Sequence, residues 1–304
     1  MEGLRQYFDR RPDGRRTCFE KVQILPAGCD LYSTDGKLSV QQRNLPSSGG
    51  PLLPLLEARI AALLARARNL AVALSGGLDS ALVLALVHRL TGRRVPVITI
   101  ATEFPGYCEL DETLETARRL NAGEVDVVRV QAEQMISALP DAIAACETPL
   151  FNLHPVTKLL LARAAAQRGF DAILTGDGAD QVFAGSDARN YLPIVGAMVR
   201  TTGIALLSPF FDERIVGWAA HHGTDAEKTP LRTVAAQIIP PEIAWRKKSP
   251  RLAPDFILEK YRDPLLEAQL APLLQLVAPG AGRGPEQTLW ATIALLVQQR
   301  GGTI

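Results

Sequence analysis

The middle of the chain alternates between short apolar runs and longer segments whose apolar positions recur at helical spacing. Short continuous apolar runs bounded by turns are typical of buried strands, whereas recurrence at about 3.6 positions is typical of helices. The pattern predicts strands at residues 70–74, 95–101, 125–130 and 172–175. It predicts helices at residues 52–68, 80–91, 110–120, 134–146 and 155–168. Strands separated by helices in this way indicate an α/β fold, with a doubly wound parallel sheet covered on both faces.

The two ends of the chain have a different character from this middle part. The amino-terminal part is strand-like at residues 17–24 and 29–33, and Asp35-Gly36 before Leu38–Val40 predicts a hairpin. Beyond residue 185 the pattern favours helices, at residues 189–200, 211–221, 229–239, 254–261, 265–276 and 285–299. We therefore expect a β-rich unit at residues 1–48 and a larger second unit at residues 49–304. Within the second unit we expect an α/β core at residues 49–185 and a mainly helical part at residues 186–304.

Composition and charge exclude several classes of protein. A net charge of +1, with 47% hydrophobic and 21% charged residues, fits a globular protein and gives no electrostatic case for a nucleic-acid or membrane partner. The four cysteines form no C-x-x-C pair, so neither a zinc site nor a disulfide framework is expected. Residues 1–16 are polar and lack the apolar core of a signal peptide, so a cytoplasmic location is expected.

A glycine turn joins the first predicted strand to the helix that follows it. The sequence Leu74-Ser-Gly-Gly-Leu-Asp-Ser80 comes directly after the apolar run. Such a turn presents backbone N–H groups at the positive end of the helix dipole, where anions bind. The glycines let phosphate oxygens approach the backbone, Ser75 and Ser80 add hydroxyl donors, and Asp79 is an oxygen ligand suited to Mg²⁺. The loop holds no lysine, so it is not the Walker pattern.

A second acidic loop, Gly176-Asp177-Gly-Ala-Asp180, follows the predicted strand at 172–175. Ligands of open α/β sheets bind beyond the carboxyl ends of strands, so we expect both loops at the same edge of the sheet. A Mg²⁺ ion that bridges phosphates is usually held by one or two protein carboxylates, and Asp79 with Asp180 would supply two. In the structural alternative Asp180 caps the next helix, which does not exclude metal binding.

Two further blocks follow, Ser208-Pro-Phe-Phe-Asp-Glu-Arg214 and Ile239-Pro-Pro-Glu-Ile-Ala-Trp-Arg-Lys-Lys248. Together with the loop at 74–80 and the segment 174–185, these two blocks make four that, in this order along the chain, resemble the synthetase domain of asparagine synthetase. The wider family includes β-lactam and carbapenam synthetases and lasso-peptide cyclases. The resemblance covers about residues 50–260 and implies the sheet of the adenine-nucleotide alpha-hydrolase type found in ATP pyrophosphatases.

The resemblance also implies a reaction and a set of site residues. A substrate carboxylate attacks the α-phosphorus of ATP and releases pyrophosphate, and an amine then attacks the acyl-adenylate and releases AMP. Lys248 would stabilise charge on the adenylate and the tetrahedral intermediate, although a solvated basic cluster is the alternative for it. The other assignments are the pyrophosphate cradle to Ser75, Gly76, Gly77 and Ser80, Mg²⁺ to Asp79 and Asp180, and adenosine, partly through backbone atoms, to Leu74, Ile100 and Gly176.

Position 177 departs from the family. Asparagine synthetases tend to have Glu there and β-lactam synthetases Tyr, and the residue faces the incoming amine. The carboxylate of Asp177 could orient an ammonium group or accept its proton. Because Asp is shorter than Glu, we expect room for a nucleophile larger than ammonia.

The amino-terminal part resembles the end of the glutamine-hydrolysing domain of asparagine synthetase, in the stretch that begins at Thr17. The rest of that domain is missing, and Glu stands at position 2, where the family has a cysteine nucleophile. We therefore expect a carboxylic-acid substrate, free or carrier-bound, and an amine from ammonia, from a second substrate, from the same molecule or from a separate ammonia-supplying protein. The sequence names neither acid nor amine, and it leaves a homodimer open.

Two alternatives stay open. A sulfur-inserting or tRNA-modifying enzyme of the same superfamily would need a positioned cysteine and a basic face, which the sequence does not show. A non-catalytic nucleotide-binding scaffold is favoured by the short segment between Gly185 and Ser208, where the family has a long helical insertion. The intact Asp79, Asp180 and Lys248 favour an enzyme.

Overall fold

The chain divides into two compact units, which we describe separately. The computed structural model describes residues 17–19, 21–46, 49–103, 108–150, 152–184, 192–247 and 286–300. The larger unit comprises Leu45–Ala138 and His154–Pro254, and the smaller comprises Met1–Asn44, Leu139–Leu153 and Asp255–Ile304. The predicted boundary at 48–49 adjoins residues 47 and 48, which lie outside the described residues, and it stays a prediction.

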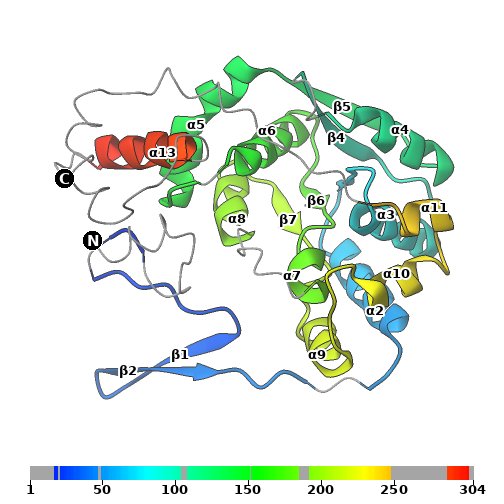
Figure 1. The fold of residues 1–304 in the computed structure, drawn as a ribbon, viewed down its shortest axis with the longest axis horizontal. Helices are drawn as coiled ribbons and strands as arrows, with labels where there is room; N and C mark the ends of the chain where they lie inside the picture. The colour runs from blue at the N-terminus through cyan, green and yellow to red at the C-terminus, as the bar shows by residue number, and fades with distance from the viewer. Residues whose placement is uncertain are drawn as a thin grey trace. The chain divides into compact units, whose positions relative to one another are not determined.

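Five parallel strands form the sheet of the larger unit, in the order β5-β4-β3-β6-β7 (Figure 1). Their bounds are Leu70–Ala73 for β3, Val97–Thr102 for β4, Val125–Val130 for β5, Ala172–Leu174 for β6 and Ala205–Leu207 for β7. The chain runs outward from β3 to β5 and then crosses back to place β6 on the other side of β3. The strand order therefore reverses between β3 and β6, which is where open α/β sheets bind their ligands.

Helices cover both faces of this sheet, as Figure 1 shows. Val72 of β3 packs in a core with α2 and α3, whereas Ala71 and Ala73 pack in a second core with α6 and α8. This alternation follows from the strand period of two, which sends successive side chains to opposite faces. The helix bounds in the larger unit are Leu52–Leu64 for α2, Leu78–Thr91 for α3, Leu110–Arg119 for α4, His154–Gln167 for α6, Ala179–Phe183 for α7, Leu192–Arg200 for α8, Glu213–His222 for α9, Thr229–Ala235 for α10 and Pro241–Ala244 for α11. Helix α5 (Ala132–Cys146) is divided between the two units, and α13 (Glu286–Gln299) belongs to the smaller unit.

Helix α3 is the central helix of the larger core. Its residues from Leu78 to Val87 are buried, except for Asp79, which lies in the first turn and is partly exposed. The helix begins after Gly77 and ends at Gly92, which adopts the left-handed conformation at which many helices stop. A helix buried on all sides has little freedom to move, so its amino terminus is a fixed point of the fold.

The predicted α/β architecture is confirmed, with several differences in detail. The strand β7 was not predicted, because its three residues lie in a part of the chain where the pattern favours helices. The strand predicted at 17–24 is wrong: residues 17–19 and 21–24 form bends, a turn and one isolated bridge. The helices predicted at 254–261 and 265–276 lie outside the described residues.

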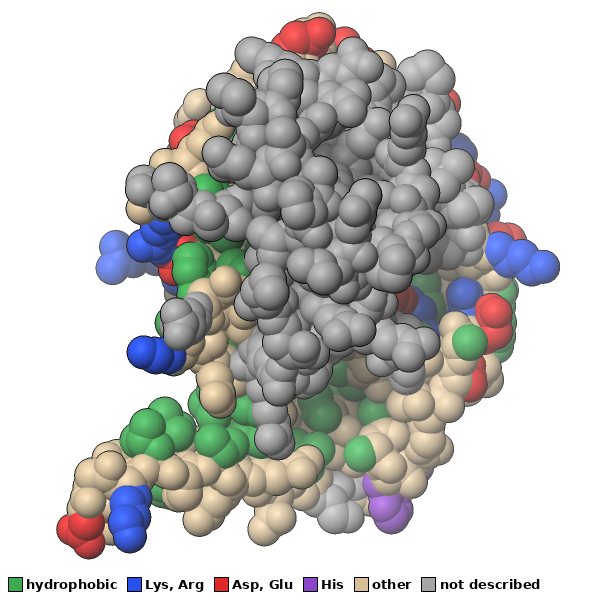
Figure 2. Space-filling model, turned by 60° about the vertical axis from the view of Figure 1, so that its left-hand side comes forward, with side chains coloured by type: hydrophobic (Ala, Val, Ile, Leu, Met, Phe, Trp, Pro, Cys, Tyr) green, Lys and Arg blue, Asp and Glu red, His purple; other side chains and the backbone are tan. Residues whose placement is uncertain are grey.

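In the smaller unit, β1 (Cys29–Thr34) and β2 (Lys37–Gln42) form the predicted hairpin. Asp35 and Gly36 have φ values of 51° and 74°, as a two-residue turn with positive φ at both positions requires. Apolar side chains of the hairpin, such as Leu38 and Val40, are exposed, and Figure 2 shows hydrophobic side chains along the arm at lower left. Within the described parts of both units, no helix has the length and apolar character needed to cross a bilayer.

Candidate active site

The turn between β3 and α3 has a compact hydrogen-bonded form. The Ser80 hydroxyl accepts a hydrogen bond from the Ser75 backbone N–H at 3.1 Å, and the two serine hydroxyls lie 3.1 Å apart. Gly76 has φ = +72°, and a Cβ atom there would lie 2.9 Å from the backbone nitrogen of Thr113. The first-turn N–H groups of a helix have no partner within the helix, so the start of α3 presents donors beside these hydroxyls.

The loop after β6 packs directly against this turn. A Cβ atom at Gly176 would lie 2.6 Å from the backbone nitrogen of Ser80 and 2.8 Å from the carbonyl carbon of Asp79. Gly178 has φ = +102°, and a Cβ atom there would lie 2.2 Å from the ring of Phe211. Glycine at position 176 therefore allows the two loops to meet, as the sequence predicts for the carboxyl ends of neighbouring strands, and glycine at position 178 allows the Phe211 ring to pack against the second loop.

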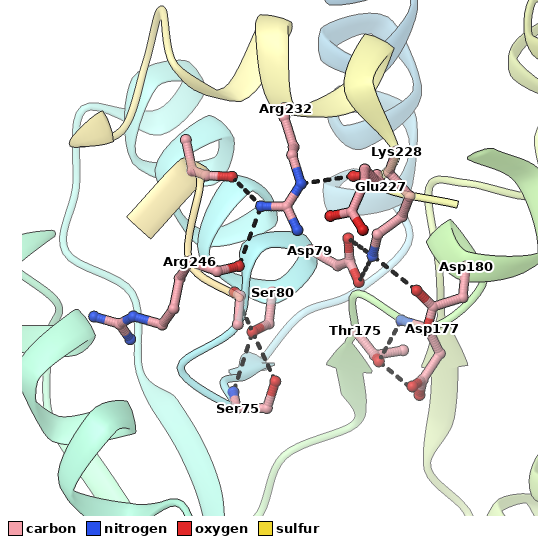
Figure 3. A network of polar contacts seen from close by, with 12 residues as sticks. Ser75, Asp79, Ser80, Thr175, Asp177, Asp180, Glu227, Lys228, Arg232 and Arg246 are labelled. Carbon is pink, nitrogen blue, oxygen red and sulfur yellow. Dashed lines mark hydrogen bonds and ion pairs between the residues drawn. The ribbon is translucent and has the colours of Figure 1, made fainter. Parts of the chain in front are cut away.

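Asp79 and Asp180 meet at one cationic group, the ammonium of Lys228 (Figure 3). The Lys228 Nζ atom lies 2.7 Å from both carboxylate oxygens of Asp79 and 2.8 Å from Oδ1 of Asp180. Lys228 is buried, with 7% of its surface exposed, and its backbone has φ = +57° just before α10. A non-glycine residue in this left-handed conformation is strained, and such strain clusters at functional sites.

Two arginines hold the segments around this cluster. The Arg232 guanidinium is buried and donates to the backbone carbonyls of Glu227 and Ala244, at 2.6 Å each, and of Arg246 at 3.2 Å. Arg246 in turn donates to the Gly76 carbonyl and the Thr116 hydroxyl, both at 3.0 Å. These bonds connect the Lys228 turn, the segment after α11 and the glycine turn, and Figure 3 shows those that Arg232 makes.

Asp177 is held as an anion at the same sheet edge. Lys158 Nζ contacts its two carboxylate oxygens at 3.1 and 2.9 Å, and the Thr175 hydroxyl donates to it at 2.7 Å. Burial raises the pKa of Asp177, but the charge of Lys158 and the hydrogen bonds from Lys158 and Thr175 outweigh burial, with a smaller effect from His154, and hold it below the ordinary value. A carboxylate with a lowered pKa is suited to orienting a cation and is a weak proton acceptor.

In Lys158→Met, we expect the free energy of unfolding at pH 7 to fall by about 1–3 kcal/mol, because the largely buried Asp177 carboxylate would lose its counter-ion. The native pKa of Asp177 lies below that of an unfolded aspartate, so its charge stabilises the fold above about pH 4, and this contribution is lost as the pH falls below about 4 and through the native pKa. The difference between wild type and variant should therefore be smaller at about pH 3 than at pH 7, which urea unfolding at these two pH values would measure. Equal losses at both pH values, with no recovery in Lys158→Met/Asp177→Asn, would contradict the ion pair.

The remaining predicted residues lie as follows. Leu74 buries its side chain in the core, so any contact with adenosine would come from its backbone. Ile100 of β4 is partly buried and packs against the core that includes α6. Lys248 lies outside the described residues, and its assignment stays a prediction.

Sequence reasoning missed Lys228, Arg232 and Lys158. The Asp225 carboxylate accepts hydrogen bonds from the backbone of Glu227 and Thr229, so a turn before α10 could have been predicted from this aspartate and Pro230. No local pattern marks a lysine in that turn as the partner of Asp79, which lies 149 positions earlier in the chain.

The residues present fit a magnesium ion. Mg²⁺ in nucleotide sites uses one or two carboxylates and completes its shell with water and phosphate oxygens. Asp79 and Asp180 already share one cationic group, the Lys228 ammonium, which shows that their oxygens reach a common point. Among the described residues there is no group of three or more His, Cys, Asp or Glu side chains that could hold a metal without further ligands.

Comparison with known proteins places this geometry in a family. Residues 52–200, which carry both loops, match the family model described as asparagine synthase. This segment is an asparagine synthase domain. The domain is of the ATP-pyrophosphatase type, and its family uses ATP for amidation chemistry.

Individual relatives of the asparagine synthase domain are distant. The chain is 23% identical over 280 residues to asparagine synthetase B [glutamine-hydrolyzing] of Escherichia coli, covering 75% of this chain and 50% of that protein. It is 30% identical over 131 residues to amidase chyE of Penicillium rubens, covering 39% of this chain and 20% of that protein. The chain thus spans half or less of the length of these curated relatives. Among solved structures, an NH3-dependent NAD synthetase from Campylobacter jejuni is similar with a TM-score of 0.41 and 16% identity, covering 84% of this chain and 98% of that chain.

Proposed function

We propose that this protein is an ATP-dependent ligase that forms amide bonds. It would join a carboxylate to AMP, releasing pyrophosphate, and then transfer the acyl group to an amine or to ammonia, releasing AMP. The observation that carries the proposal is the meeting of Asp79 and Asp180 at one cationic centre, beside the amino terminus of α3 and within an asparagine synthase domain.

The roles of the described residues follow from their positions. The start of α3 and the hydroxyls of Ser75 and Ser80 offer donors to the phosphates of ATP. Asp79 and Asp180 would hold Mg²⁺, which neutralises phosphate charge when it is bound. The pyrophosphate released in the first half-reaction would therefore be stabilised at the place where its charge develops.

The second half-reaction requires a group that positions the amine. Asp177 is an anion fixed by Lys158 and Thr175, at the sheet edge that also carries Asp180. In our proposal it attracts and orients a cationic amine, while proton removal falls to the leaving group or to solvent because the pKa of Asp177 is low. Lys248 is proposed to stabilise charge on the adenylate.

Exchange of labelled pyrophosphate into ATP tests this function directly. The protein is incubated with ATP, Mg²⁺ and labelled pyrophosphate over a panel of carboxylic acids, because reversal of adenylation incorporates the label only in the presence of the correct acid. We expect exchange with one acid or a narrow class of acids, and AMP formation when a panel of amines or ammonia is then added.

Three results would contradict the ligase. Failure to bind ATP in calorimetry would remove the nucleotide site itself. Release of ADP in place of AMP and pyrophosphate would show cleavage at the wrong phosphate. Binding of ATP without exchange over a wide panel would favour the scaffold alternative.

A further inference from the structure

The Lys228 ammonium occupies the position between Asp79 and Asp180 where a metal ion would have to bind. Three carboxylate oxygens lie within 2.8 Å of its Nζ atom. Ligand oxygens lie about 2.0–2.1 Å from Mg²⁺. A metal between these carboxylates would therefore overlap the ammonium, and two cations so close would repel each other strongly. Lys228 and a bound metal cannot share this position.

The backbone of Lys228 is fixed, whereas its side chain can move. The Lys228 N–H donates to the Asp225 carbonyl at 2.9 Å, and the Lys228 carbonyl accepts from the Arg232 N–H at 3.0 Å. The Arg232 guanidinium also holds the neighbouring Glu227 carbonyl at 2.6 Å. A lysine side chain has a flexible four-carbon stem, so the ammonium can leave the carboxylates while the turn stays in place.

We propose that Lys228 determines how the metal enters this site: its ammonium occupies the position between Asp79 and Asp180 until a metal arrives together with nucleotide. This inference rests on the proposed function, because it takes the two carboxylates as the metal ligands. A free divalent ion must separate the ammonium from both carboxylates without offering it another partner. A nucleotide brings phosphate oxygens that can receive the displaced ammonium, so metal and nucleotide bind as one complex.

The charges at the site give the expected direction of the effect. Two carboxylates and one ammonium carry a net charge of −1, whereas the carboxylates alone carry −2. Removal of the ammonium takes away a cation that contacts both partly buried carboxylates, which favours a divalent ion in the place of the ammonium. Loss of Lys228 should therefore strengthen the binding of free metal, the opposite of what a supporting structural lysine would do.

Titration with Mn²⁺ in the absence of nucleotide tests the proposal, with free Mn²⁺ measured by electron paramagnetic resonance at constant ionic strength. We expect Lys228→Met to bind Mn²⁺ about tenfold or more tightly than wild type does. Lys228→Arg, which keeps the charge, should remain like wild type. In Lys228→Met/Asp79→Asn the gain should disappear, which would assign it to this site. Unchanged Mn²⁺ affinity in Lys228→Met, or an equal gain in Lys228→Arg, would overturn the proposal.

Lys158→Met is the matched control. Lys158 pairs with Asp177, which lies on the same loop as Asp180. The loss of Lys158 therefore also removes one positive charge from beside an aspartate near the site. Any gain in Mn²⁺ affinity in this variant should be much smaller than the gain in Lys228→Met, and a gain equal to that of Lys228→Met would show a general charge effect and overturn the proposal. Near-ultraviolet circular dichroism confirms that each variant is folded before titration.

A second arm repeats the titration with α,β-methylene-ATP, which lacks the bond that would be cleaved. The difference between wild type and Lys228→Met should shrink, because the nucleotide brings partners for the ammonium. Calorimetry of the same analogue reports separately whether nucleotide binds at all. Absence of nucleotide binding would refute the proposed function, while the Mn²⁺ titration would still decide whether Lys228 excludes free metal.

Discussion

In Asp79→Asn, pyrophosphate exchange into ATP is expected to fall by about 10²–10³-fold, with the fold intact. Asp79 provides two of the three carboxylate oxygens around the shared cationic centre, and an amide carries no charge to hold a divalent ion there. The side chain also lies in the first turn of α3, so the substitution removes a favourable interaction with the helix dipole. The dipole effect is worth less than about 1 kcal/mol, so it cannot account for a loss of this size.

Asp111→Asn is the matched control for this result. Asp111 also lies in the first turn of a helix, α4, but it is exposed. Both variants lose one carboxylate at a helix amino terminus, and only one loses a member of the cluster around Lys228. Exchange in Asp111→Asn should stay within about twofold of wild type. Wild-type exchange in Asp79→Asn, measured at saturating acid and ATP, would show that Asp79 takes no part in adenylation.

The two loops could be predicted because their chemistry is local. In each, an apolar strand ends in glycine and aspartate, and the carboxyl ends of parallel strands share one edge of the sheet. The positions of Ser75, Asp79 and Asp180 just after predicted strands were therefore enough to predict that they lie close together, without knowledge of the strand order. The structure confirms the meeting of the loops down to the glycine, Gly176, that lets them touch.

The cations of the site could not be predicted in the same way. Lys228 contacts Asp79 across 149 positions of the chain, and Arg246 contacts Gly76 across 170. Such contacts depend on how α10 and the segment after α11 pack on α3, and periodicity carries no information about that packing. In the sequence Arg246 is the first of three consecutive basic residues, which indicates no particular contact, whereas in the structure it binds the carbonyl of the glycine turn.

The two errors in strand prediction have physical reasons as well. The three residues of β7 are too short for periodicity to separate a strand from the end of a helix, and pairing with β6 decides their state. Residues 17–24 have β-branched and aromatic side chains, but among the described residues of this stretch only Gln23 forms a bridge, and a segment without a partner strand does not form a ladder.

Gly176→Ala is expected to lower the free energy of unfolding by about 1–3 kcal/mol and to weaken ATP binding at least tenfold, roughly in line with overpacking of a close contact. The new Cβ would lie 2.6 Å from the Ser80 backbone nitrogen and 2.8 Å from the Asp79 carbonyl carbon. Neither atom belongs to a flexible side chain, and α3 is buried on nearly all sides, so the strain must move the β6 loop or the helix start. Either movement would separate Asp180 from Asp79.

Gly49→Ala provides the comparison, because a Cβ atom there would meet nothing within 4 Å and no positive φ is involved. That variant should match wild type in urea unfolding and in calorimetric titration with ATP, because alanine at an unstrained glycine is neutral or mildly stabilising. If Gly176→Ala behaved like Gly49→Ala in both measurements, the close packing of the two loops would not be what aligns the carboxylates. If Gly176→Ala lost stability but kept the wild-type ATP affinity, the close contact would stabilise the edge of the sheet without being needed to align the ATP site.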